Sequence, residues 1–321
     1  MAWGLLPQNG IVAERRWQHK TSLQVPSSPH LRYKVAMKIP KRILPLVEDG
    51  LVDEVLRPLM SGKEADVFVV RCGREERCAK IYKEAHKRSF KQAVTYQEGR
   101  KVRNSRRARA MEKGSKFGRK QQEDLWQNAE VDALYRLDSA GVRVPKPYGC
   151  FDGVLLMELI TSDDGRVAPR LNDVSMSEEQ ALEDHELVMD YVKRMLCAGI
   201  VHGDLSEFNV LVDDYGPVII DLPQAVDAVA NNNAQSMLDR DIANMTNYYA
   251  MFAPQLLETR YSSELWSVFE AGDLHPEYPL TGEFEDPEDE ADVDSVLLEI
   301  KAAMEEEEER LERIRDANEP D

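Results

Sequence analysis

The chain has 321 residues, enough for one large domain or two ordinary ones, and its 42% hydrophobic content supports a sizeable core. Its uninterrupted apolar stretches are far shorter than the roughly 20 residues of a membrane span, and the N-terminus lacks the basic region and long apolar core of a signal peptide. Both features argue against a membrane protein or a secreted one. The four cysteines show no paired metal-ligand spacing, so we expect reduced thiols in a cytoplasmic protein.

The net charge of −18 is distributed unevenly along the chain. Residues 282–321 hold 18 acids and 4 bases, so this segment alone contributes −14. Residues 84–122, by contrast, hold 14 Lys, Arg and His residues and only three acids. The sequence therefore predicts a folded body with one basic segment and one acidic tail.

Residues 1–36 carry scattered prolines and polar residues without periodicity, and we expect a disordered extension there, with Met37 as a candidate start of the protein. Across residues 37–60, apolar side chains recur at roughly helical spacing, which predicts a helical segment. Breaks near Pro45, Gly50 and Pro58 are expected to divide this helix into pieces.

Beyond this segment the apolar period changes. The alternation in residues 66–71 and 77–82 predicts two antiparallel strands joined by a glycine turn. The strongest predicted helix covers residues 177–198, because Ser177 and Gln180 fit a capping box at its start. The other expected elements are a helix over 123–140, strands over 148–151 and 154–159, a hairpin over 209–212 and 218–220, and helices over 237–257 and 294–314.

The most informative chemical pattern follows the strongest helix. A polar loop carries Asp204 and, five residues later, Asn209, and a short apolar hairpin then ends at Asp221. ATP-dependent phosphoryl-transfer enzymes place a base and two magnesium ligands in this order. Asp204 is the candidate base that orients an acceptor hydroxyl, and Asn209 and Asp221 supply oxygen ligands suited to Mg²⁺. Each acid alone could cap a loop or form a salt bridge, but the joint spacing favours catalysis; His202 is expected to be structural.

A second group of residues is suited to phosphate binding. Lys80 lies in an otherwise apolar predicted strand, where a charge is costly unless it is used, and Glu130 on the next helix is the best acid to orient it. The alternative is a solvent-facing lysine on an edge strand. Upstream, the loop that begins at Ser61 can fold over phosphates through its backbone N–H groups and the Ser61 hydroxyl.

Strands dominate the first half of the body and helices the second. This order predicts an α+β fold with a small antiparallel-sheet lobe over a helical lobe and a nucleotide between them. We expect the N-terminal lobe at residues 61–160, including the flexible basic loop 84–122, and the C-terminal lobe at 161–281. The acidic tail, 282–321, is expected to be partly helical or disordered.

The sequence resembles the RIO family of atypical Ser/Thr protein kinases over roughly residues 45–258, closest to the type-one branch and to a bacterial member of it. The motifs that carry this resemblance are Ser61-Gly-Lys-Glu-Ala65, Lys80-Ile-Tyr-Lys83, Leu155-Leu-Met-Glu-Leu-Ile160, His202-Gly-Asp-Leu-Ser-Glu-Phe-Asn209 and Ile219-Ile-Asp-Leu-Pro-Gln224.

The resemblance implies a two-lobed protein-kinase-like fold, use of ATP with Mg²⁺ or Mn²⁺, and adenine contacts from the backbone of Glu158 and Ile160. It also implies Ser autophosphorylation, ATP hydrolysis through a phospho-aspartate at Asp221, and a role in ribosome maturation on the small subunit. The chain departs from the family at Pro223, where relatives often carry Ser or Gly, which puts the mobility of the metal-binding loop in doubt.

Several residues typical of signalling kinases are missing from the sequence. Gly203 stands where those enzymes have an arginine before the base, and Ser206 replaces the lysine two residues after it. No Ala-Pro-Glu sequence follows Asp221. We therefore expect a truncated peptide-docking region, and a protein whose main task is not the phosphorylation of peptides in bulk.

The basic stretch 87–120 has two interpretations. It is either a solvated flexible loop or a contact for an RNA phosphate backbone, which would link the protein to RNA or a pre-ribosomal particle. The stretch also offers Ser89, Ser105 and Ser115 as self-phosphorylation sites. The acidic tail is either a solvating segment or an arm that pairs with the basic loop and competes with RNA.

Two other functions fit parts of the sequence. A small-molecule phosphotransferase of the aminoglycoside or choline kinase type also uses His-Gly-Asp with an Asn five residues on. However, those enzymes usually carry a His or Pro stretch where this chain has Ser206-Glu207. The third possibility is an ATP-switched module that assembles RNA–protein particles with little kinase turnover.

Overall fold

The computed structural model describes residues 39–62, 65–83 and 129–285, and the chain divides into two compact units, Met1–Leu280 and Thr281–Asp321. The fold below is that of the first unit. The extension at 1–36, the basic loop 84–122 with its three candidate serines, and the helix expected over 294–314 lie outside the described residues.

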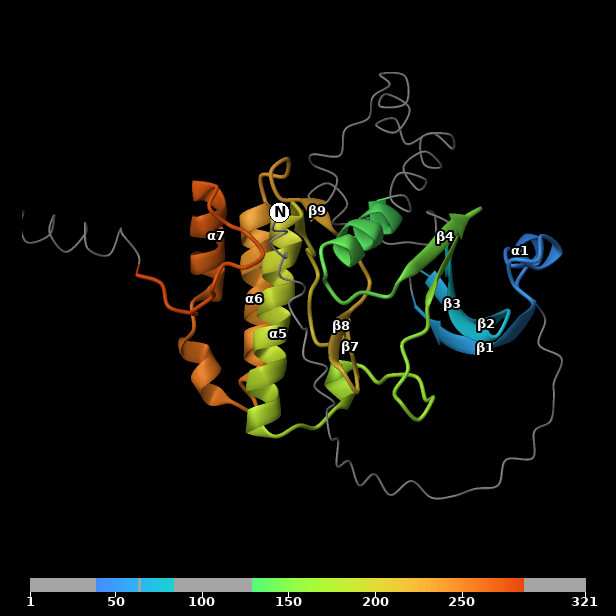
Figure 1. Cartoon of the computed structure of the whole chain (residues 1–321), viewed down its shortest axis with the longest axis horizontal. Coiled ribbons are helices and arrows are strands. Elements are labelled where there is room, and N and C mark those ends of the chain that lie inside the picture. The colour runs from blue at the N-terminus through green and yellow to red at the C-terminus, as the bar shows by residue number, and fades with distance from the viewer. Residues whose placement is uncertain (1–38, 63–64, 84–128, 286–321) are drawn as a thin grey trace, which may run out of the picture. The chain divides into compact units, whose positions relative to one another are not determined.

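A five-stranded antiparallel sheet forms the N-terminal lobe (Figure 1). Its strands lie in the order β1-β2-β3-β5-β4, with hydrogen-bonded neighbours antiparallel. The predicted strands of this region are confirmed, each within two residues of its expected ends. The five strands are β1 Glu54–Ser61, which was not predicted, β2 Ala65–Cys72, β3 Glu75–Tyr82, β4 Pro147–Phe151 and β5 Val154–Glu158.

The helical segment expected over residues 37–60 is largely wrong. Only α1, Leu44–Glu48, is helical, and the chain from Glu54 onward is strand β1, which pairs along its length with β2. The apolar residues here fit either period, because bulges between Val55 and Arg57 and between Pro58 and Met60 disturb the strand's alternation. The segment is a strand because it pairs with β2. The pattern of a single segment cannot reveal such pairing.

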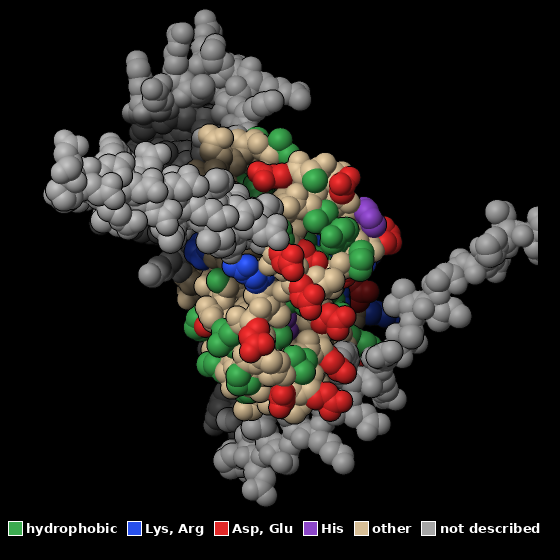
Figure 2. Space-filling model, turned by 90° about the vertical axis from the view of Figure 1, so that its left-hand side faces the viewer, with side chains coloured by type: hydrophobic (Ala, Val, Ile, Leu, Met, Phe, Trp, Pro, Cys, Tyr) green, Lys and Arg blue, Asp and Glu red, His purple; other side chains and the backbone are tan. Residues whose placement is uncertain are grey.

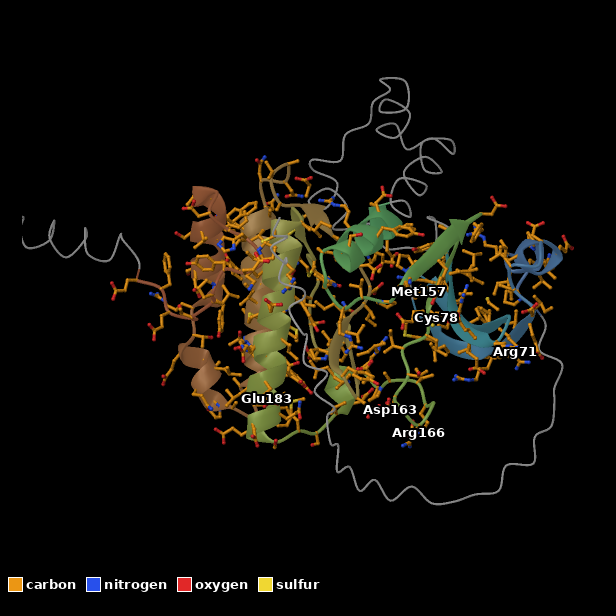
Figure 3. All side chains as sticks on the ribbon, viewed as in Figure 1. Arg71, Cys78, Met157, Asp163, Arg166 and Glu183 are labelled. Carbon is orange, nitrogen blue, oxygen red and sulfur yellow. The ribbon has the colours of Figure 1, made fainter. Side chains whose placement is uncertain are left out.

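The two faces of the sheet bury different apolar clusters. On one face α1 packs through Ile43 and Leu46 against residues of β2, β3 and β5. The other face carries a smaller cluster of Val67, Val69, Cys78 and Leu159. Figure 3 labels Cys78 on β3 and Met157 opposite it on β5, and the two residues are register partners.

The helix over residues 129–139 connects the sheet to the main core. Ala133, Leu134 and Leu137 are buried in the same cluster as Tyr82 of β3 and the helices of the second lobe. The described part of the helix predicted over 123–140 is therefore helical, and its first residues lie outside the described range.

The C-terminal lobe is built around α5, Glu178–Cys197, and α6, Ala234–Tyr249, with α7, Tyr261–Ala271, beside them (Figure 1). The Ser177 hydroxyl accepts a hydrogen bond from the Gln180 N–H at 3.2 Å, so the predicted cap of α5 is present. The short elements are η2 Leu171–Asp173, η3 Pro254–Glu258, and the strand pairs β6 Ile200–Val201 with β9 Val226–Asp227 and β7 Val210–Asp213 with β8 Gly216–Ile219.

The helices in the last third of this lobe differ from those predicted from the sequence. The helix predicted over 237–257 starts at Ala234 and ends at Tyr249, because Pro254 cannot continue it and begins a short 3₁₀ turn instead. Helix α7 was not predicted. The α+β class, with sheet before helices, is confirmed. The four cysteines are free, and none of the described helices is long and apolar enough to cross a membrane.

Candidate active site

The loop between β6 and β7 carries two of the predicted site residues. The Asn209 amide donates from Nδ2 to the Asp204 carbonyl oxygen at 2.8 Å, so its own oxygen is turned away from this contact and can serve as a ligand. Asp204 Oδ2 accepts a hydrogen bond of 3.1 Å from Gln224 Nε2. The pKa of Asp204 is raised by its partial burial and by the nearby carboxylate of Asp221.

Helix α6 holds this loop from behind through Asp241, which is almost fully buried. Its two carboxylate oxygens accept the backbone N–H groups of Gly203 at 2.7 Å and Leu205 at 3.0 Å, so both residues flanking Asp204 are fixed. Gly203 adopts φ 79°, a left-handed conformation that favours glycine over the arginine found in signalling kinases. Burial raises the pKa of Asp241 to about 7, against the opposing effect of the two N–H donors.

His202 is part of the loop's framework. Its Nε2 donates to the Ile220 carbonyl at 3.1 Å, and its Nδ1 accepts the Asp204 N–H at 3.2 Å, so both ring nitrogens are engaged by backbone. Burial lowers its pKa to about 4. The geometry agrees with the expected structural role, because the ring ties the strand before Asp221 to the loop that carries Asp204.

Lys80 lies at the centre of the charged cluster. Its ammonium is 2.6 Å from Glu130 Oε1 and 2.7 Å from Asp221 Oδ1, which brings together three of the predicted residues from sequence positions up to 141 apart. Tyr82 donates its hydroxyl hydrogen to the other Glu130 oxygen at 2.5 Å. Burial alone would lower the pKa of Lys80, but Asp221 and Glu130 outweigh it and raise the pKa. Lys80 is thus a buried, paired cation rather than a surface lysine.

Asp221 joins the two halves of the site. It adopts φ 67°, a conformation uncommon for a residue with a side chain and often found at functional positions. Burial tends to raise its pKa, but the Lys80 ammonium prevails and the pKa is lowered, so the carboxylate is ionised at neutral pH. The structure therefore presents a charged oxygen ligand two residues after β8. That strand pairs with β7, which begins directly after Asn209.

The residues present fit Mg²⁺ or Mn²⁺ held jointly with a nucleotide. Among the described residues, no group of three or more His, Cys, Asp or Glu side chains is gathered closely enough to hold a metal unaided. Mg²⁺ is usually held by one or two carboxylates together with substrate phosphates and water, rather than by an all-protein cage. One carboxylate from Asp221 and one amide oxygen from Asn209 match that donor set.

Two small apolar clusters lie next to the chain segment that links the lobes. The cluster of the sheet contains Val67 and Cys78, and a second cluster contains Ile160, Ala168 and Val218 with Leu211 packed against it. Leu159 belongs to the first cluster and Ile160 to the second, so both clusters adjoin this segment.

The segment between these clusters holds Glu158 and Ile160, the predicted adenine contacts. The Glu158 N–H donates to the Lys146 carbonyl at 2.9 Å, and the Ile160 carbonyl accepts the Ala168 N–H at 3.0 Å. Contacts of these two residues with an adenine ring stay a prediction.

Ser61 ends strand β1 at the edge of the sheet. Its hydroxyl donates to Asp66 Oδ1 at 2.5 Å, and Lys83 donates to the Gly62 carbonyl at 2.6 Å. The turn is therefore closed by side chains of β2 and of the residue after β3, although residues 63–64 lie outside the described range. The predicted phosphate contact of Ser61 also stays a prediction.

Sequence reasoning missed three residues of this site: Tyr82, Gln224 and Asp241. Tyr82 follows Lys80 by two positions on a strand, which places both on one face and was a usable signal. Asp241 interrupts the apolar face formed by Met237, Leu238 and Met245 on α6, and an acid at such a position calls for a partner. For Gln224 the sequence offers no comparable signal.

The sheet lobe, the helical lobe and the cluster of Lys80, Glu130 and Asp221 together define a kinase-like protein. A family model described as the RIO domain matches residues 66–262. The chain therefore belongs to the RIO family of serine/threonine kinases. The connection between Asp221 and the start of α6 at Ala234 is short, and the truncated peptide-docking region stays a prediction.

Named relatives are similar over most of the folded body. The chain is 38% identical over 208 residues to the RIO-type serine/threonine-protein kinase Rio1 of Haloferax volcanii, covering 64% of this chain and 67% of that protein. It is 32% identical over 213 residues to the serine/threonine-protein kinase RIO1 of Homo sapiens, covering 66% of this chain and 36% of that protein.

The fold of the chain is also similar to that of a solved structure. The crystal structure of the Rio2 kinase-ADP/Mg2+-phosphoaspartate complex from Chaetomium thermophilum matches 65% of this chain and 59% of that chain, with 21% identity and a TM-score of 0.47. This chain thus spans little more than a third of the human relative and somewhat over half of the Rio2 chain.

Proposed function

We propose that the protein is an ATP- and Mg²⁺-dependent kinase and ATPase that phosphorylates itself. The observation that carries the proposal is the meeting of Lys80, Glu130 and Asp221, with Asp204 and Asn209 on the adjoining loop. Lys80 would contact the α- and β-phosphates while remaining oriented by Glu130. A bound Mg²⁺ neutralises charge on the phosphates, and Asn209 and Asp221 are the residues that would hold it.

The transfer to a serine follows from the position of Asp204. The acceptor hydroxyl attacks the γ-phosphorus, the bond between that phosphorus and the β-phosphate oxygen breaks, and ADP leaves. Asp204 orients the hydroxyl and accepts its proton as the new bond forms. Its raised pKa suits a group that holds a proton for part of the cycle. Ser89, Ser105 and Ser115 are the candidate acceptors within the chain.

A second acceptor is the carboxylate of Asp221. The related Rio2 structure is described as a phosphoaspartate complex, and Asp221 is an ionised carboxylate next to the candidate metal ligand Asn209. Attack by an Asp221 oxygen on the γ-phosphorus would release ADP and leave an acyl phosphate, which water then hydrolyses to aspartate and phosphate. This route turns ATP over without any second protein.

For a partner, we propose RNA or a pre-ribosomal particle bound through residues 87–120, with the protein acting in the cytoplasm. Basic residues dominate this stretch of sequence, whereas the face of the helical lobe seen in Figure 2 displays many more Asp and Glu than Lys and Arg side chains. An acidic face repels a phosphate backbone, so this face of the lobe is a poor RNA surface.

Incubation of the purified protein with γ-labelled ATP tests the activity. We expect label on the protein and release of phosphate with Mg²⁺, and neither with excess chelator. Absence of both products with Mg²⁺ would overturn the proposal. Multiple turnovers on a small cationic substrate, without label on the protein, would instead identify a small-molecule phosphotransferase.

Co-purification tests the partner. Wild type and Asp204→Ala are isolated from cells, and the RNA and proteins retained by each are identified. A ribosomal precursor trapped by Asp204→Ala supports a role in maturation, and its absence from both preparations would discard that role.

A further inference from the structure

Arg170 lies in the C-terminal lobe, on the segment that runs beside β7. The Pro169 carbonyl accepts the Val212 N–H at 3.0 Å, and Arg170 itself forms a β-bridge with Leu211. Leu211 packs on the small apolar cluster beneath the segment that links the lobes. The backbone of Arg170 is therefore fixed beside the strand that leads away from Asn209.

The Arg170 side chain extends from the C-terminal lobe to the N-terminal lobe. Its guanidinium Nη2 donates to the sulfur of Met60 at 2.7 Å, and Met60 immediately precedes Ser61 on strand β1. The side chain thus links the two lobes at the level of the predicted phosphate loop.

The contact with Met60 uses only one nitrogen of the guanidinium, Nη2. A thioether sulfur is a weak hydrogen-bond acceptor, whereas an arginine offers five N–H donors in a planar fork that matches phosphate oxygens. Exchanging the sulfur for a phosphate oxygen replaces a weak contact with a charge-assisted one. Met60 is exposed, so it can give way to a ligand at little cost.

We propose that Arg170 is a phosphate-contacting residue that closes on the nucleotide from the C-terminal lobe, opposite Lys80. The inference rests on the proposed function, since it needs a nucleotide in this site. It adds a second cation to the phosphate site and a residue that binds the charged part of the nucleotide but not its base.

Calorimetric titration with ATP, ADP and adenosine, without metal, tests the proposal. Arg170→Met keeps a side chain of similar reach but removes the charge, and we expect about ten-fold weaker binding of ATP and ADP with adenosine unchanged. Arg166→Met is the matched control: Arg166 belongs to the same connecting segment, is highly exposed and pairs with Asp164. The control should bind all three ligands as the wild type does.

Two results would overturn the assignment. Equal losses for adenosine and ATP would show that Arg170 only supports the shape of the cleft, and unchanged ATP binding would show that it touches no phosphate. If Arg170→Met fails to fold, Arg170→Lys decides, because it keeps the charge but loses the fork. We then expect weaker ATP binding relative to adenosine, and an unchanged ratio would reject the proposal. A wild type that binds no nucleotide contradicts the proposed function itself.

Discussion

The two lobes hold their parts of the site by different means. In the C-terminal lobe, the loop that carries Asp204 is fixed through its backbone, by Asp241 on α6 and by the ring of His202. In the N-terminal lobe, the ammonium of Lys80 is held by ion pairs with Glu130 and Asp221. Backbone anchors survive a change of side chain at the anchored position, whereas ion pairs do not.

This difference suggests a division of tasks between the lobes. The loop that carries the base is held against a large apolar core before any ligand arrives, because its anchors His202 and Asp241 are buried and hydrogen-bonded. Lys80, by contrast, is paired with Asp221, a group that would also hold a metal ion. We therefore expect binding of nucleotide and metal to rearrange the contact between the lobes while the loop of Asp204 stays as it is.

The largest effect is expected from Asp204→Ala. Loss of the base should lower kcat by about 10²- to 10⁴-fold while the melting temperature changes little, because the backbone anchors of the loop remain. Initial rates of serine phosphorylation and thermal unfolding measure the two properties. Asp138→Ala, which removes an exposed acid from the helix over 129–139, should leave both unchanged. A large loss of stability in Asp204→Ala would contradict the idea of a preformed loop.

Lys80→Met should reduce stability as well as activity. It leaves the carboxylate of Glu130, only 2% exposed, without its cation, at a cost of about 3–5 kcal/mol in the free energy of unfolding. Lys83→Met breaks a more exposed pair with Asp66 and should cost less than about 1 kcal/mol. Chemical denaturation of both variants gives the comparison. Equal stabilities would mean that Lys80 is not held by a buried pair.

Asp241→Ala should weaken the anchor of the catalytic loop. Two buried backbone N–H groups would lose their acceptor, with a cost of about 1–3 kcal/mol in stability. The rate of phosphoryl transfer should fall with it, because Asp204 is no longer fixed on both sides. Asp239→Ala, an exposed position on the same helix that contacts Ser262, is the control. Full activity in Asp241→Ala would show that the loop holds its shape without α6.

A smaller effect concerns acid stability. Burial lowers the pKa of His185 to about 4, below its value of 6.5 in an unfolded chain. The unfolded state therefore binds the proton more readily, and stability should fall as the pH drops from about 6.5 towards 4. His185→Gln, which can still reach Thr246, should flatten this acid limb in denaturation midpoints measured across that range. An unaltered limb would assign the acid sensitivity to other groups, such as His202.

The sequence predicted the residues of the catalytic loop better than it predicted their surroundings. Lys80 was expected to pair with Glu130, and it does, because a lysine in an apolar strand needs an acid. The strand of residues 54–61 was mistaken for helix, since its pairing with β2 depends on residues far along the chain. Asp241 reaches the site through packing between distant elements, which no local pattern records.

The most direct test of the account compares Asp221→Asn with Asp227→Asn in Mg²⁺-dependent ATP hydrolysis. Asp221 joins the lobes and is assigned to the metal, whereas Asp227 lies on β9 and its side chain accepts the nearby backbone N–H groups of Val229 and Ala230. We expect the rate of ATP hydrolysis to fall at least about a hundred-fold in Asp221→Asn and to stay at the wild-type level in Asp227→Asn. Hydrolysis by Asp221→Asn at the wild-type rate would contradict the assignment of this site.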